Sequence, residues 1–180
     1  MDVLFLDIDG VLNSTRSLLH AEKATPTNPE VDFLFGLSNT YYSGYPVSIL
    51  TVDLLGLDTA CIKHLNLVIE ATGAQVVVSS SWRFCHNIVG LQKLLEYRGF
   101  KGELIDITPV NLVGPEKLRG HEIQAWLDLN PEADRFVILD DDDDMGHLKR
   151  YLVKVDKKVG LTEKNALEAI SIVKPDSIRV

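Results

Sequence analysis

The sequence predicts an α/β domain with a doubly wound, Rossmann-like and mostly parallel sheet that carries helices on both faces. Three observations predict it: short apolar runs recur along the chain, segments with helical spacing separate them, and turn-forming residues stand at their ends. Strands that alternate with amphipathic helices are typical of a parallel sheet with crossover helices. The length of 180 residues suits one core, so we expect a single domain over residues 1–180.

The strands are expected where apolar and β-branched residues run together without a helical period. The first, Val3–Leu6, is followed by the turn-forming pair Asp9 and Gly10. A short run that is apolar throughout is typical of a strand buried on both faces. The other expected strands are Gln75–Val78, Glu103–Ile107, Arg135–Leu139 and Tyr151–Val155.

Helices are expected between the strands, where start and stop signals flank apolar positions at helical spacing. Asp58 can cap one helix, which ends at Gly73, and Thr162 can cap the last, which Pro175 closes. The apolar positions of the four expected helices are Ile62, Leu65 and Ile69; Ile88, Leu91, Leu94 and Leu95; Ile123, Trp126 and Leu127; and Leu167, Ile170 and Val173.

Residues 14–56 interrupt this alternation. The stretch contains three prolines and a cluster of aromatic residues, and it is long for a connection. Connections longer than ~15 residues are usually lids or binding loops. We therefore expect an inserted flap or small cap over the carboxyl ends of the strands.

Composition excludes several classes of protein. Hydrophobic residues make up 46% of the chain and charged residues 24%, which is typical of a globular domain, and no apolar run approaches the ~20 residues of a membrane span. Two cysteines without a CxxC or HExxH motif exclude a disulfide framework and a common zinc site. The acidic start lacks the features of a secretory signal, so a cytoplasmic location is expected. We expect Cys61 and Cys85 to be small buried hydrophobic residues.

The net charge of −8 is unevenly distributed. From Met145 onward there are eight basic and four acidic residues, whereas the whole chain has 18 basic and 26 acidic ones. A solvated lysine-rich surface is the simplest interpretation of this basic tail, and a nucleic-acid groove is the alternative.

Two acids directly follow the first strand. Asp7 and Asp9 are two residues apart, so their side chains point the same way in an extended segment. Two close carboxylates repel unless a cation neutralises them or one keeps a proton, and Mg²⁺ prefers oxygen ligands. We expect Asp7 to be a nucleophile toward phosphorus, Asp9 to be a general acid, and Gly10 to lie against the substrate.

Five further acids, residues 140–144, follow the strand Arg135–Leu139. Mg²⁺ bound by Asp140 and Asp141 would offset their repulsion and join them to Asp7. An EF-hand loop is excluded, because its glycine and twelfth-position glutamate are missing. We expect Asp142 to Asp144 to form a solvated loop.

Hydroxyl and basic side chains complete the set of candidates. Ser79 and Ser80 stand where the strand Gln75–Val78 ends, and hydroxyls with backbone N–H groups at such a turn can hold phosphate oxygens. Arg83 could add a bidentate phosphate contact. A cation that stabilises charge on the phosphoryl group is expected from Lys117 or Arg119.

The joint pattern resembles the haloacid dehalogenase (HAD) superfamily of phosphohydrolases. A carboxylate nucleophile with a second acid two residues on, then a hydroxyl, a cation and paired acids, follow one another in that order. More narrowly, LDIDGVLN, ATGAQVVVSSSWR, RGHEIQAWL, FVILDDD and VGLTEKNA resemble the HAD domain associated with RNA-repair proteins.

The resemblance implies a role for each matching residue. Asp7 would form an aspartyl-phosphate, and Asp9 would act as acid, then as base, and bind metal through its backbone carbonyl. Ser79, or Ser80 if the strand ends later, would hold the phosphoryl group. Arg119 or Lys117 would be the cation. The metal ligands would be Asp7, Asp9, Asp140 and Asp141.

The sequence therefore predicts a Mg²⁺-dependent phosphomonoesterase that acts on a nucleotide or on a nucleic-acid terminal phosphate. A phosphotransferase that uses another phosphorylated metabolite remains open, as does a receiver-like module that accepts phosphate without turnover. A scaffold that only retained the fold is disfavoured, because the acids, hydroxyl and cation are all present. No membrane association and no obligate protein partner are expected.

Overall fold

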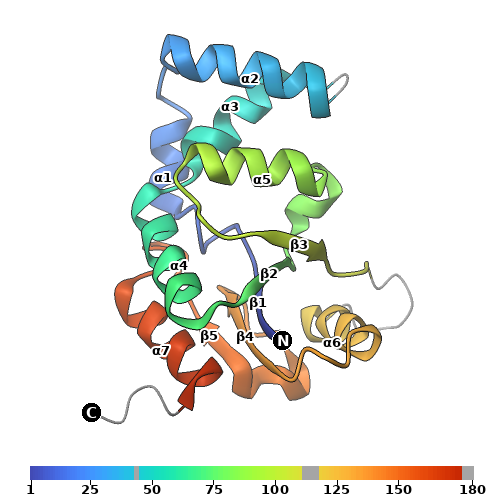
Figure 1. The fold of residues 1–180 in the computed structure, drawn as a ribbon. Helices are drawn as coiled ribbons and strands as arrows, with labels where there is room; N and C mark the ends of the chain where they lie inside the picture. Colours follow the sequence, from blue (N-terminus) through green and yellow to red (C-terminus); the bar gives the residue numbers. More distant parts are fainter. Residues whose placement is uncertain (43–44, 111–117, 176–180) are drawn as a thin grey trace.

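The computed structural model describes residues 1–42, 45–110 and 118–175. Its centre is a five-stranded, all-parallel sheet with the strand order β3-β2-β1-β4-β5 (Figure 1). The chain adds β2 and β3 on one side of β1 and then returns to add β4 and β5 on the other side. The strands are β1 (Asp2–Leu6), β2 (Gln75–Val78), β3 (Leu104–Ile107), β4 (Arg135–Asp140) and β5 (Leu152–Lys154).

Helices cover both faces of the sheet, which confirms the predicted fold class. Side chains of one strand alternate between the faces, so Leu4 and Leu6 join one core and Val3 and Phe5 join the other. Residues of α4, α5 and α7 pack on the first face, and residues of α6 and the 3₁₀-helix η2 pack on the second. The helices outside the insertion are α4 (Thr59–Thr72), α5 (Ile88–Tyr97), α6 (Arg119–Leu129) and α7 (Glu163–Val173), with the 3₁₀-helices η1 (Ser81–Phe84) and η2 (Gly146–Tyr151).

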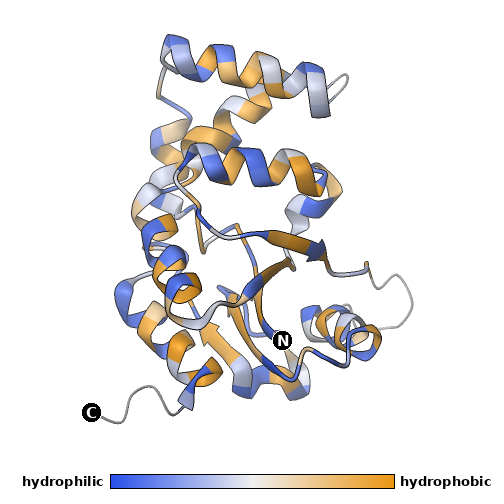
Figure 2. Cartoon of the chain, in the orientation of Figure 1, coloured by the Kyte–Doolittle hydropathy of each residue, from blue (hydrophilic) through white to orange (hydrophobic). Residues whose placement is uncertain are grey.

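The hydropathy of the elements explains this layering. Figure 2 shows strands that are largely hydrophobic and helices on which hydrophobic and hydrophilic residues alternate around the axis. Of the β1 residues, Val3 to Leu6 have no exposed surface. The buried strands and one-sided helices are what a parallel sheet between two helical layers requires. In the described part of the chain, no helix combines the length and apolar character needed to cross a bilayer.

The inserted stretch is helical, not an irregular flap. It forms α1 (Thr15–Ala21), α2 (Asn28–Tyr41) and α3 (Val47–Gly56). Two prolines that suggested a loop instead stand at helix starts: Pro29 lies in the first turn of α2, and Pro46 is the N-cap of α3. A proline fits there because the first N–H groups of a helix have no partner within it.

The inserted helices share the core of the sheet domain. Leu34, Leu50 and Leu54 are fully buried and belong to the same apolar cluster as Leu91 and Leu94 of α5. Figure 1 shows α2 and α3 stacked beyond α5, away from α6. The insertion is thus packed onto one helical layer, so a freely swinging lid is not compatible with this core.

Several strand boundaries differ from the sequence expectation by one residue: β1 begins at Asp2, β3 begins at Leu104 and β5 ends at Lys154. Strand β4 continues through Asp140, one residue beyond the expected end, because its ladder with β5 extends to Lys154. The expected fifth strand began at Tyr151, but this residue ends the 3₁₀-helix η2 and β5 starts at Leu152.

Replacing Leu54 by alanine tests the shared core. Because Leu54 is fully buried, Leu54→Ala should lower the free energy of unfolding by about 2–5 kcal/mol while unfolding stays a single transition. Denaturant unfolding followed by circular dichroism measures both. Leu19→Ala, in the same insertion but 54% exposed, is the matched control and should change little. A separate early transition for the insertion would contradict the shared core.

Candidate active site

The candidate site lies where the strand order reverses. β1 and β4 are adjacent, although most of the chain lies between them in sequence. Asp7 directly follows β1, and its N–H donates to the carbonyl of Leu139 on β4 (2.9 Å). Asp140, the residue after Leu139, ends β4. Ligands of parallel α/β sheets bind at the carboxyl ends of the strands at such a switch point. The fold therefore places two of the predicted acids at the usual ligand position.

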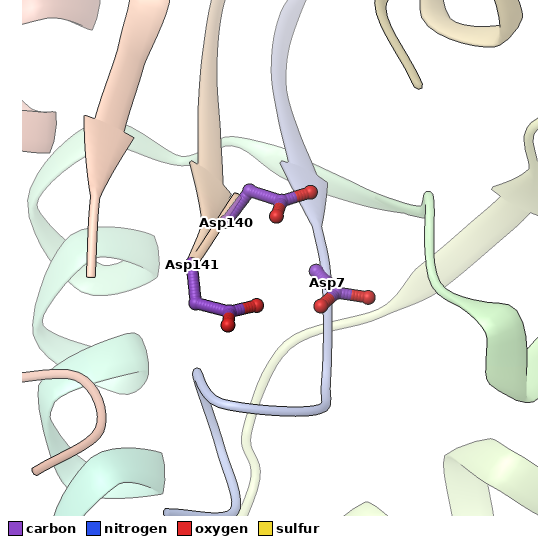
Figure 3. A group of neighbouring side chains, drawn as sticks. All are labelled: Asp7, Asp140 and Asp141. Atoms are coloured by element: carbon purple, nitrogen blue, oxygen red, sulfur yellow. The ribbon is translucent and has the colours of Figure 1, made fainter. Parts of the chain in front are cut away.

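Three carboxylates converge there. One oxygen each from Asp7, Asp140 and Asp141 lies within 4.8 Å of the other two (Figure 3). Asp7 is 5% exposed and Asp140 is 2% exposed. The Oδ2 atom of Asp140 is buried and accepts no hydrogen bond from any described residue. Buried, mutually close carboxylate oxygens with unused acceptor capacity are the donor set that a hard divalent cation prefers, so these residues fit Mg²⁺.

Burial and mutual repulsion act on the protonation of these acids. Burial raises the pKa of Asp7, and the guanidinium of Arg119 only partly opposes this effect. Burial also raises the pKa of Asp140, and the Asp7 carboxylate raises it further. The pKa of Asp141 is raised for the same first reason, while Lys157 lowers it. The pocket thus disfavours its own negative charges when no cation is present.

Of the two predicted cations, the structure describes Arg119, which lies beside the acids. Its Nη2 lies 3.9 Å from Oδ1 of Asp7, and its Nε lies 3.8 Å from Oδ2 of Asp140. The Arg119 side chain is 20% exposed, so it can contact a substrate as well as the acids. These positions favour Arg119 in the predicted role, while Lys117 lies outside the described residues.

The start of α6 fixes where Arg119 stands. The Arg119 N–H donates to Oδ2 of Asp144 (3.0 Å), which supplies the N-terminal cap that Leu118 cannot provide. Gly120 packs so closely that a Cβ atom there would clash with the Met145 carbonyl. The expectation that Asp144 belongs to a solvated loop is therefore wrong, whereas Asp142 and Asp143 are exposed as expected.

Two of the three Arg83 donor nitrogens are engaged by neighbouring residues, while its buried Nε has no hydrogen-bond partner among the described residues. Its Nη2 donates to Oε2 of Glu122 (2.6 Å), and its Nη1 donates to the Ser80 carbonyl (3.0 Å). Its side chain is only 3% exposed. Because Oε2 of Glu122 is also 3.5 Å from Nη1 of Arg119, these contacts favour a role for Arg83 in holding the cation in place. Direct phosphate binding by Arg83 stays a prediction.

Asp9 lies on a tight turn beside the three acids. Gly10 has a φ of 75°, which favours glycine, and a Cβ atom there would lie 2.6 Å from Cγ of Asp141. The Gly10 N–H donates to the Asn13 side chain (2.9 Å), and Asn13 in turn donates to Oδ1 of Asp9 (2.9 Å). Gly10 thus brings the turn against Asp141; its contact with substrate stays a prediction.

Both candidate serines are fully buried after β2. A hydrogen-bonding interaction with the Ser80 side chain lowers the pKa of Asp7. The hydroxyl oxygen of Ser79 has no hydrogen-bond partner among the described residues. Binding of a phosphoryl oxygen by either hydroxyl stays a prediction, and the choice between them stays open.

Two residues of the site were not predicted. Trp82 donates its indole N–H to Oδ1 of Asp9 (2.9 Å), and Asn13 donates to the same oxygen. Their positions within the two motifs, DIDGVLN and SSSWR, were the available signal. Cys61 is buried as expected, but the expectation for Cys85 is wrong, because this residue is exposed at the end of η1.

The fold and this group of side chains define a phosphatase domain of the HAD type. The chain belongs to the family described as "HAD domain in Swiss Army Knife RNA repair proteins", whose model matches residues 3–166. A search of the curated proteins found no match. Among solved structures, a predicted phosphatase from Clostridium acetobutylicum is 18% identical, with a TM-score of 0.42 over 92% of this chain and 89% of that one.

Asp140→Asn tests the predicted cation site. Burial raises the pKa of Asp140 to about 8 in the folded protein, so stability falls as pH rises from the pKa of the unfolded chain toward that of the folded one. An asparagine does not ionise, so the variant should raise the melting temperature of the metal-free protein at pH 7. Mg²⁺ at about 100 times its Kd should add roughly 5–10 °C to the wild type and little to the variant. Thermal unfolding with and without Mg²⁺ measures this.

Asp143→Asn is the matched control, because Asp143 is an exposed acid of the same run that pairs with Lys149 and Lys154. It should keep the full Mg²⁺ shift. An Asp140→Asn protein that also keeps this shift would contradict the assignment of Asp140 as a metal ligand.

Proposed function

We propose that this HAD-type phosphatase is a Mg²⁺-dependent phosphomonoesterase that works through an aspartyl-phosphate. Its substrate would be a nucleotide or the terminal phosphate of a nucleic acid. The convergence of Asp7, Asp140 and Asp141 beneath Arg119 at the switch point is the observation that carries the proposal. The description of the family, which names RNA repair, supports the nucleic-acid part.

In the first half-reaction, a carboxylate oxygen of Asp7 attacks phosphorus as the bond from phosphorus to the leaving oxygen breaks. Asp9 gives its proton to that oxygen, which leaves as an alcohol. In the second half-reaction, water attacks the phosphorus of the aspartyl-phosphate, Asp9 takes the proton of the water, and the bond to Asp7 breaks. Phosphate leaves, and both aspartates return to their starting states.

Charge is the main obstacle to this reaction, because a buried carboxylate must approach an anionic phosphoryl group. Arg119 faces both, at 3.9 Å from Asp7 and with its side chain partly exposed. Mg²⁺ held by Asp7, Asp140 and Asp141 would neutralise the acids and draw charge from the phosphoryl oxygens. The buried hydroxyl of Ser79 or Ser80, at the end of β2, would donate a hydrogen bond to a phosphoryl oxygen.

Basic residues beside the acids support a polyanionic substrate. A groove of about 590 Å³ is lined by Lys154 and Lys157 together with the acids Asp141, Asp142 and Asp156, so two lysines lie next to a predicted metal ligand. A separate cavity of about 480 Å³ is lined by Arg16, Arg98 and Lys158 among others. Basic side chains at these surfaces would contact further phosphates of a nucleic acid bound there.

The proposal includes a cytoplasmic location and action without an obligate protein partner. Both cysteines are free thiols, as a reducing compartment would keep them.

Asp7→Asn tests the nucleophile. The amide cannot attack phosphorus, so the rate of phosphate release from an aryl phosphate should fall by roughly 10³-fold or more while the fold is kept. Steady-state release measured with Mg²⁺ gives the rate, and acid-quenched wild type should carry a phosphate that hydroxylamine removes. Asp128→Asn, on the exposed side of α6, is the control. Full activity of Asp7→Asn would reject the assignment, and a single turnover by the wild type would favour a receiver-like module.

Lys157→Gln tests the substrate class. If Lys157 contacts a substrate phosphate, the variant should lose several-fold more kcat/KM on a phosphorylated oligonucleotide than on an aryl phosphate, and the salt dependence on the oligonucleotide should weaken by a slope of about 1. Lys164→Gln, an exposed lysine on α7, is the matched control. Equal losses on both substrates would contradict a nucleic-acid contact at Lys157.

A further inference from the structure

The two oxygens of the Asp9 carboxylate have different surroundings. Oδ1 accepts two N–H donors, from the Trp82 indole and from the Asn13 side chain, each at 2.9 Å. Oδ2 accepts only the longer contact from the Ser81 hydroxyl, at 3.4 Å, among the described residues. An oxygen that faces two N–H donors cannot also carry a proton toward them. The transferable proton of Asp9 therefore belongs on Oδ2.

The Trp82 indole, which donates to Oδ1 of Asp9, packs with its ring face against another aromatic ring. His86 stacks on Trp82, with ring centroids 4.8 Å apart and an angle of 21° between the planes. The His86 side chain is 3% exposed, so the stack is closed to solvent. Trp82 is 8% exposed, and its ring cannot turn without displacing His86.

The inserted segment anchors His86 from two sides. A 2.8 Å hydrogen bond joins Nδ1 of His86 to the hydroxyl of Tyr42, at the end of α2. Nε2 of His86 also lies 3.4 Å from Oδ2 of Asp53, on α3, without making a hydrogen bond to it. The chain of contacts thus runs from two inserted helices through His86 and Trp82 to one oxygen of Asp9.

We propose that Trp82 is a positioning residue that directs Oδ2 of Asp9 at the leaving group, and that His86, held by the Tyr42 hydroxyl, keeps the indole in place. This inference rests on the proposed function and adds to it the residues that orient the acid. Its chemical step is the one given above: the proton leaves Oδ2 of Asp9 for the leaving oxygen while the phosphorus–oxygen bond breaks and the bond to Asp7 forms.

The dependence of rate on the leaving group separates this role from a merely structural one. A general acid matters when the leaving group is a poor alkoxide, as in a mononucleotide, and matters little for p-nitrophenolate. The parameter to compare is kcat/KM with Mg²⁺, because it reports the steps up to the first irreversible one, which includes loss of the leaving group.

Trp82→Phe keeps a ring for the stack but removes the N–H donor. We expect kcat/KM on a mononucleotide to fall about tenfold or more, and kcat/KM on p-nitrophenyl phosphate to fall less than about threefold. Trp126→Phe is the matched control: Trp126 is also buried and its indole donates to a carboxylate, Oδ2 of Asp106 (2.7 Å), on the opposite face of the sheet. It should leave the ratio of the two values unchanged.

Tyr42→Phe is the second variant, which leaves Trp82 intact and removes only the hydroxyl that anchors His86. It should change the ratio in the same direction by a smaller factor, and it keeps the test available if Trp82→Phe does not fold. Equal losses on both substrates in the folded variants, or the same ratio change in Trp126→Phe, would overturn the inference. A wild type that hydrolyses neither substrate would instead overturn the proposed function.

Discussion

Repulsion among buried carboxylates at the junction of β1 and β4 is the constraint on which the rest of this site depends. Asp7 and Asp140 are brought together by strand register, and their burial opposes their own ionisation. The positive charge of Arg119 partly offsets this cost. Its position requires that the start of α6 packs directly on the loop after β4. Close approach at Gly10 and Gly120 is therefore part of the electrostatics of the site.

The insertion is coupled to the chemistry through packing and not through a hinge. Its leucines continue the core around α5, and its polar residues Tyr42 and Asp53 reach His86. A change in the inserted helices would thus alter the orientation of Asp9 before it altered the three acids. In this arrangement, the segment that would select substrates and the group that would transfer the proton share one mechanical connection.

Most strands and helices of the sheet domain could be predicted from the sequence, because the signals that mark them are local. β1 and β2, the helix beginning at Thr59 and the capping residue Thr162 each have a pattern that needs no tertiary information. The acids became candidates for a similar reason, since each follows a strand, and Arg119 was one of two candidate cations near the start of a helix. The helices of the insertion were not predicted, because prolines at helix starts look like loop residues until their register is known.

Other features depended on contacts across the fold and could not be predicted. Asp144 caps α6, which begins 25 residues earlier, and the two Nη atoms of Arg83 donate to Glu122 and to the Ser80 carbonyl. The chain's two tryptophans lie on different faces of the sheet: Trp126, on α6, is in the core of one face, and Trp82 stacks on His86 beside Asp9. Intrinsic fluorescence therefore reports each helical layer through its own indole, and emission from Trp82 carries the state of the loop that bears Asp9.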